Sequence, residues 1–241
     1  MFGITVLALS SWGLRLAIAA PLLAITLIAL FRLGVFDFRL PLLGVAVATF
    51  LAIVALLLSI AALIGGFGGD GAHIQNSVIA LVLSLAVLYA PVTTIRKGGD
   101  VPRIHDISTD LDNPPVFETV PGLRAASDNS LEIDEKVQAA QKAHYTAIVP
   151  LTLPGTPGNN FAAALAAAEN MGWEIVASNA AQGHIEATAT TALFGFKDDV
   201  VIRLSAVNDG TRVDVRSASR VGLSDLGANA ARIQAYLAKL D

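Results

Sequence analysis

The 241-residue sequence has no cysteine, which excludes a disulfide framework, a thiolate zinc site and a cysteine nucleophile. Charge is also scarce, because 15% of the residues are charged while 54% are hydrophobic and the mean hydropathy is +0.62. A single soluble domain is not this apolar, so a membrane protein is expected. The net charge of −4 and the pI near 5.5 argue against a nucleic-acid partner, since phosphate binding needs a basic face.

Charge is scarcest in the first 95 residues, where the charged side chains are Arg15, Arg32, Asp37, Arg39 and Asp70. Three apolar runs in this part, residues 14–33, 40–64 and 74–95, reach the ~20 residues needed to cross a bilayer. Tyr89, near the end of the third run, fits an interfacial anchor. Residues 1–95 are therefore predicted to be a membrane anchor of three transmembrane helices, with the lipid bilayer as partner.

Two features of this part have competing interpretations. Residues 1–20 end in AIAAP like a signal peptide, but no basic residue precedes their apolar stretch and the apolar pattern continues through Leu33. The glycine-rich GGFGGDGAH, residues 65–73, lacks the GK[ST] ending of a phosphate cradle, so a flexible turn between two spans is favoured. The spans have no acidic or histidine residue deep in a run, which gives a transport path little support.

Basic residues near span ends predict the orientation, because they are retained in the cytoplasm. The loop after the first span shares a side with the segment after the third, and together they hold Arg32, Arg39, Arg96, Lys97 and Arg103 against Arg15 on the other side. This count places the C-terminal part in the cytoplasm.

Residues 96–144 are predicted to be an extended tether with a short helix from about Glu132 to His144. The pair Pro114-Pro115 cannot lie inside a helix or a central strand. This segment is therefore expected either to wrap the following domain or to space it from the bilayer.

Residues 145–241 show the periods of an α+β domain. HYTAIVPLTL predicts a strand, PGNN starts a helix with one apolar face, and Gly172 ends that helix. Four alternating segments follow, WEIVASN, HIEATATT, DDVVIRLSAV and TRVDVRSAS, with the hairpin signal NDG before the last. A final helix is expected to be capped by Ser224 or Asp225. The fold class predicted for the chain is α+β, with three transmembrane helices followed by a small antiparallel sheet that two helices cover on one face.

Alternation along these strands assigns side chains to the two faces of the sheet. The helix-covered face is predicted to hold Ile185, Ala187, Ala189, Val200, Ile202, Leu204, Val213 and Val215. The opposite face is predicted to hold His184, Glu186, Thr188, Thr190, Asp199, Val201, Arg203, Ser205, Asp214 and Arg216. That second face is charged but balanced.

Three stretches carry a family resemblance: RIHDISTDLDNPPVF (103–117), GWEIVASNAAQGHIEATATTALFGFKDDVVIRL (172–204) and VDVRSASRVGLSDLGANAARI (213–233). They resemble the DUF1499 family, a bacterial and plastid domain of unknown function, over roughly residues 100–241. The three-span anchor is similar to that of proteobacterial members, which implies the bacterial inner membrane. Other members resemble lipoproteins or organelle-lumen proteins, which implies an extracytoplasmic domain, so the side stays open. Shorter relatives carry a cysteine-bearing N-terminal region, and no role of that cysteine transfers to this chain.

The dense polar cluster near the C-terminus contains the predicted ligand-binding residues: Arg203, Asp214, Arg216, Ser217, Ser219, Arg220, Ser224 and Asp225. With Asp198, Asp199, Asn229 and Arg232, these residues could instead form a structural network of cross-strand ion pairs and a helix cap. As a binding site, serines and arginines ahead of a helix N-terminus suit an anion such as a lipid head group or a phosphorylated metabolite.

Catalysis is the third interpretation. His184 and Glu186 on one strand face are weak metal candidates, which His105 and Asp106 of the tether could complete. No familiar metal spacing or GxSxG elbow is present, so no catalytic residue and no cofactor are predicted. The predicted function is a non-enzymatic, membrane-anchored binding or accessory module for a membrane or envelope protein or an anionic ligand. A membrane-tethered, metal-assisted hydrolase is the alternative.

Overall fold

The computed structural model describes residues 2–66, 71–208 and 210–241 and divides the chain into two compact units, residues 1–96 and 97–241. The first unit consists of helices α1 (Phe2–Arg32), α2 (Arg39–Gly65) and α3 (Gly71–Gly98), of which α3 runs two residues past the unit boundary. All three helices are long and apolar enough to cross a membrane, over Thr5–Arg32, Arg39–Gly65 and Gly71–Arg96. Three membrane-capable helices are thus confirmed.

The first helix is longer than expected. Its apolar sequence continues on the N-terminal side of Arg15, and the AIAAP stretch lies inside the uninterrupted helix α1, which includes Pro21. Of the predicted glycine-rich turn, residues 67–70 lie outside the described residues, and the turn's last residues already belong to α3.

Small residues let the three helices approach one another. One buried cluster joins Ala17, Ala55 and Ala80, and another joins Ala20, Ala48 and Ala52. Small side chains at helix contacts are typical of membrane bundles, where close packing replaces the hydrophobic effect.

The third helix also buries polar side chains. His73, expected in the turn, lies in the first helical turn of α3 with 3% of its surface exposed, and Ser77 and Ser84 are fully buried. His73 Nε2 and both serine hydroxyls have no hydrogen-bond partner among the described residues. Polar groups buried in this way are costly in an apolar environment.

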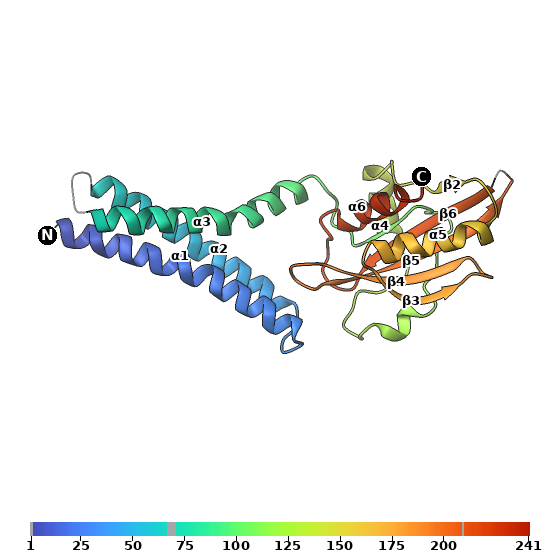
Figure 1. Cartoon of the computed structure of the whole chain (residues 1–241), viewed down its shortest axis with the longest axis horizontal. Helices are drawn as coiled ribbons and strands as arrows, with labels where there is room; N and C mark the ends of the chain where they lie inside the picture. Colours follow the sequence, from blue (N-terminus) through green and yellow to red (C-terminus); the bar gives the residue numbers. More distant parts are fainter. Residues whose placement is uncertain (1, 67–70, 209) are drawn as a thin grey trace. The chain divides into compact units, whose positions relative to one another are not determined.

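The second unit is built on an antiparallel sheet with the strand order β1-β6-β5-β4-β3, and β2 pairs with the same edge of β6 as β1. Figure 1 labels β6, β5, β4 and β3 in this order across the sheet. Within the described residues the strands are β1 (Asp106–Ser108), β2 (Leu151–Leu153), β3 (Glu174–Asn179), β4 (His184–Thr190), β5 (Lys197–Val207) and β6 (Gly210–Ser219). The four predicted C-terminal strands are confirmed, as is the β5–β6 hairpin, in which Val207 pairs with Gly210; Asp209 of its NDG signal lies outside the described residues.

The segment expected to be a tether is part of this folded unit. It contributes β1, the 3-10 helix η1 (Val120–Leu123) and the helix α4 (Glu135–His144). The buried Gln141 of α4 exchanges two hydrogen bonds, 3.0 and 2.6 Å long, with the backbone of Ser108 in β1. Strand β1 was missed because three residues are too few to show alternation, and the strand expected over 144–153 shrinks to β2 between Pro150 and Pro154.

Helices α5 (Pro157–Asn170) and α6 (Ala228–Leu237) cover one face of the sheet (Figure 1). Gly172, at φ +74°, ends α5 as expected, since a left-handed residue favours glycine. The N-cap of α6 is Gly227, not Ser224 or Asp225 as expected. From the loop before the helix, the Asp225 carboxylate still accepts hydrogen bonds from the backbone N–H of Gly227 and Asn229 at 2.8 and 2.9 Å.

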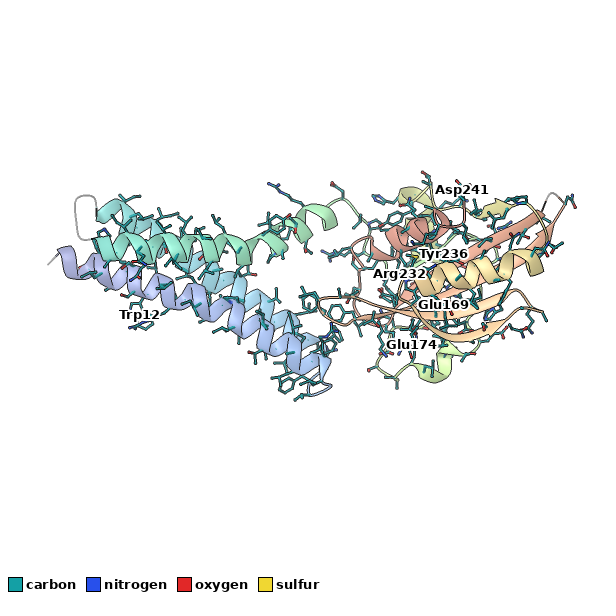
Figure 2. All side chains as sticks on the ribbon, in the orientation of Figure 1. Trp12, Glu169, Glu174, Arg232, Tyr236 and Asp241 are labelled. Atoms are coloured by element: carbon teal, nitrogen blue, oxygen red, sulfur yellow. The ribbon has the colours of Figure 1, made fainter. Side chains whose placement is uncertain are left out.

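The core lies between these helices and the sheet. All eight side chains predicted for the helix-covered face belong to it. Tyr236, labelled in Figure 2, is a fully buried residue of α6. Trp173 stacks on it with ring centroids 5.3 Å apart, and the Tyr236 hydroxyl donates to the Ala164 carbonyl at 2.9 Å. Burial raises the pKa of Tyr236.

Candidate functional site

The second face of the sheet is the polar face that alternation predicts, but the chain covers it. Residues 109–131, which we call the strap, leave β1 and cross this face. Phe117 and Val120 of the strap pack on Val201 and Ala218 of the sheet in a small buried cluster. The charged side chains beneath therefore need partners inside the protein, because burying an unpaired charge is costly.

Glu186, in the middle of β4, is fully buried and binds the backbone of the strap. Its carboxylate accepts hydrogen bonds from the N–H groups of Glu118, Thr119 and Val120, over 2.6 to 3.1 Å, and lies 2.8 Å from His184 Nε2. The three N–H groups precede or begin η1, where backbone donors have no partner within the helix.

These contacts determine the protonation of Glu186 and His184. Burial acts to raise the pKa of Glu186, but the hydrogen bonds from His184 and from the strap N–H groups outweigh it and lower the pKa from 4.5 to about 2. The same hydrogen bond to Glu186 raises the pKa of His184. Glu186 is therefore an ionised structural acceptor.

Asp199, in β5, is the second attachment point of the strap. Its carboxylate, also fully buried, accepts from Arg124 Nε of the strap at 2.8 Å, from Arg220 at 2.8 and 2.9 Å, and from the Thr188 hydroxyl at 2.8 Å. The hydrogen bond to Asp199 raises the pKa of Arg220. Both guanidinium groups are thus held by one carboxylate.

Arg216, in β6, connects the strap to strand β1. Its guanidinium, 4% exposed, bonds the Asp106 carboxylate at 2.7 to 3.2 Å and donates to the Leu131 carbonyl at 2.7 Å. It also lies 5.4 Å from the centre of the Phe117 ring. Asp106 and Phe117 are residues that sequence reasoning did not connect to Arg216.

At the far end of the face, Arg203 and Arg212 share two carboxylates. Both arginines bond Asp110 of the strap and Asp214 of β6, at 2.8 to 3.2 Å. Arg203 and Arg212 are 24% and 37% exposed, so this group lies at the rim of the covered face.

The remaining predicted ligand-binding residues lie elsewhere, so the cluster is not one site. Ser217 and Ser219 point to the helix-covered face, where their hydroxyls bond Asn229 of α6 at 2.7 and 2.9 Å. Asn229 in turn lies beside Arg232, which pairs with Asp198. Adjacent residues of a strand face opposite ways, and this separates Ser217 and Ser219 from Arg216 and Arg220. Ser224 and Asp225 lie in the loop before α6, where the Ser224 hydroxyl accepts from the Leu226 N–H at 3.3 Å.

His184 and Glu186 are in contact, but Asp106 of the tether, expected to help complete a metal site, does not join them. Strands β6 and β5 lie between β1, which holds Asp106, and β4, which holds His184 and Glu186, a separation of about 14 Å at ~4.8 Å per strand. Asp106 binds Arg216 instead. In the part of the chain that the structure describes, no group of three or more His, Cys, Asp or Glu side chains is placed to hold a metal.

One open groove lies on the outside of the strap. It has a volume of about 380 Å³ and is lined by Pro121, Arg124, Asn129, Ser130, Leu131 and Glu132. Asn129 fixes this part of the strap by donating from its amide to the carbonyls of Ser219 and Gly222 at 3.1 and 2.8 Å. No sequence signal marks the groove, because its residues come from an irregular segment without periodicity.

A second cavity, between α4 and the strap, holds about 20 Å³ and borders Asp106, Gln141 and Arg216. This volume suits a single water molecule. It leaves no room for an organic ligand.

The family described as "Protein of unknown function (DUF1499)" matches residues 106–240, which is more than half of the chain and includes the strap. No curated protein matches the chain.

Proposed function

The chain belongs to the DUF1499 family, and we propose that it is a membrane-anchored, non-catalytic binding module whose partner is a protein rather than an anion. The proposal rests on one observation, that the arginines of the polar cluster already bind the domain's own carboxylates.

The charge balance supports a cationic segment of the partner. Residues 97–241 contain seven arginines, and six of them form ion pairs within the domain: Arg124, Arg203, Arg212, Arg216, Arg220 and Arg232. The same residues contain 12 Lys and Arg against 18 Asp and Glu, a net charge of −6. An anionic head group or phosphorylated ligand would meet no unpaired guanidinium in the cluster and a negative field around it.

The groove on the strap is the recognition surface in this proposal. Leu123, between the groove residues Pro121 and Arg124 in the sequence, is 50% exposed, and Glu132 of the groove lining is an exposed acidic residue. An apolar side chain together with a carboxylate suits a peptide segment that carries both apolar and basic residues. Because the strap is bonded to the sheet through its backbone, the groove is pre-formed and binding needs little ordering.

The localisation that goes with this function is the bacterial inner membrane, with the side decided by experiment. The charge count predicts a cytoplasmic domain, whereas the family resemblance predicts the opposite side. A single Gly158→Cys substitution, exposed in the first turn of α5, can be labelled with a membrane-impermeant maleimide. Labelling only after lysis supports the charge count, and labelling of intact cells assigns the partner to the envelope.

A membrane-tethered, metal-assisted hydrolase remains the alternative, and the 2.8 Å contact between His184 and Glu186 is the observation in its favour. An imidazole oriented by a carboxylate is the geometry of a general base. This function is the weaker of the two because three strap N–H groups also occupy the carboxylate. A chelator-sensitive hydrolytic activity that is lost in Glu186→Gln would establish it.

Photo-crosslinking tests the binding proposal. With p-benzoylphenylalanine at Leu123 of the full chain in native membranes, we expect one discrete protein adduct. The same group at Val207, which is 40% exposed at the opposite end of the sheet, is the matched control. The adduct should disappear in Glu132→Lys and persist in Glu169→Lys, an equal charge change on α5. Adducts that form equally at positions 123 and 207 would contradict the proposal that the groove binds the partner. An adduct that persists in Glu132→Lys would also contradict it.

A further inference from the structure

Three segments of the domain meet at one end of the sheet. They are the entry segment after α3 (residues 99–105), the β4–β5 turn (191–196) and the β6–α6 loop (220–227). The Arg220 N–H donates to the Lys197 carbonyl at 3.0 Å, and the Asp225 N–H donates to the Ile104 carbonyl at 3.0 Å. These backbone bonds tie the three segments into one surface, which we call the leucine end.

The leucine end exposes large apolar side chains. Leu223 is 80% exposed, more than any other large hydrophobic residue in the described part of the chain, including those on the membrane helices. Leu193 and Leu226 are 61% and 44% exposed. In the β4–β5 turn, Phe194 and Phe196 stack with their ring centroids 4.9 Å apart, which gives the turn a rigid base. Exposed apolar groups gathered in one place mark an interaction surface.

The covalent chain restricts where this surface can be. Helix α3 ends at Gly98, and the buried Ile104 is already bonded into the leucine end. The five residues 99–103 can extend over at most about 17 Å. If Gly71–Arg96 spans a membrane, the length of this linker limits how far Ile104 can lie from the membrane surface.

The charges at the leucine end suit a lipid surface. Arg103 and Lys197 are exposed, one in the entry segment and one directly after the β4–β5 turn. The acidic side chains at this end are the exposed Asp100 of the entry segment, and Asp128 and Glu174, whose charges act on Arg220. Basic side chains beside apolar ones are typical of protein surfaces that lie in the lipid head-group region. The domain as a whole is acidic, so this basic edge differs from its surroundings.

We infer that the leucine end docks on the bilayer in which the chain's own helices sit, with Leu193, Leu223 and Leu226 inserted among the lipid head groups. The occupant of this surface is therefore lipid. The inference needs only a membrane-spanning α3 and is independent of the groove on the strap.

Fluorescence quenching by lipid tests the docking directly, because the chain has no cysteine of its own. The full-length protein with Leu223→Cys, labelled with an NBD fluorophore, is reconstituted into phosphatidylcholine vesicles containing phosphatidylglycerol, with or without a doxyl-labelled lipid. Val207→Cys is the control, about 30 Å away along β5. We expect several-fold stronger quenching at position 223 than at position 207. A label at Leu193→Cys should likewise be quenched several-fold more strongly than the label at 207.

Two outcomes would overturn the inference. Equal quenching at positions 223 and 207 would place the leucine end away from lipid. A blue-shifted emission at 223 without quenching would show that protein, and not lipid, covers it. The double substitution Arg103→Glu and Lys197→Glu should weaken quenching in vesicles with phosphatidylglycerol and have little effect in pure phosphatidylcholine. If the double substitution leaves quenching unchanged in both vesicle types, Arg103 and Lys197 do not contribute to docking by binding anionic lipid.

Discussion

Replacing Glu186 by glutamine keeps the size of the side chain but removes the charge that holds the strap. The carboxylate is fully buried, with three strap N–H donors and His184 around it. Glutamine resembles the protonated acid, and its NH₂ group would face N–H donors. The variant is therefore expected to loosen the strap while the rest of the sheet stays paired.

The lowered pKa gives the magnitude. The difference between 4.5 and about 2 corresponds to about 3 kcal/mol of preference for the charged form. Because the pKa is lower in the folded state, this stability is present above pH 4.5 and is lost as the pH falls toward 2. Glu186→Gln should thus lower the free energy of unfolding by about 3 kcal/mol at pH 7 and by only about 1 kcal/mol at pH 3.

The domain has a selective optical probe. The chain contains two tryptophans, Trp12 in α1 and Trp173 in the domain core. In a Trp12→Phe background, denaturant unfolding followed by Trp173 fluorescence reports on the domain alone. Hydrogen exchange of the amides of residues 118–120 reports on the strap itself and should accelerate in the variant.

The matched control is Glu118→Gln, since Glu118 is exposed and bonds Glu186 through its backbone N–H, while its carboxylate acts on His184 only through its charge. It should change stability by less than about 0.5 kcal/mol. A cost for Glu186→Gln that is below 1 kcal/mol at pH 7, or that does not shrink at low pH, would refute the reasoning. Slow exchange at residues 118–120 in the variant would do the same.

Three further predictions concern the same domain. Arg216→Ala should cost about 3–5 kcal/mol in denaturant unfolding because it leaves Asp106 without its partner, whereas Arg212→Ala, at a 37% exposed position, should cost about 1 kcal/mol or less. Gly172→Ala should lower stability by about 1–2 kcal/mol, seen as a lower Tm, because its φ of +74° strains any residue with a Cβ. In an NMR titration, the pKa of His184 should fall when Glu186→Gln removes the bond that raises it; since that raised pKa stabilises the fold below about pH 6.5, this contribution should also disappear.

Local sequence patterns predicted much of the fold. The three membrane-capable helices follow from runs of apolar residues, and the two faces of the sheet follow from the two-residue period of β4, β5 and β6. Gly172 ends α5 through its own backbone freedom. Each of these features depends on residues that are close together in the sequence.

The candidate site was harder to predict because its contacts are distant in the sequence. Arg124 and Asp199 are 75 positions apart, and Arg216 and Asp106 are 110 apart. The strap has no period, so the Pro114-Pro115 pair predicted an extended segment but did not decide whether it wraps the domain or spaces it from the bilayer. The same absence of pattern hid the three-residue strand β1 and the groove.

By itself, then, the sequence determined an apolar three-helix unit, an α+β domain and a polar sheet face, because hydrophobic periodicity is a local property. Only the tertiary structure decided what the polar face is for. The strap lies across the charged face of the sheet, and charges buried in this way must be paired. Glu186, Asp199 and Arg216 therefore bind the strap instead of a ligand. Because of that pairing, we propose the outer groove and the leucine end, rather than the polar face, as the binding surfaces.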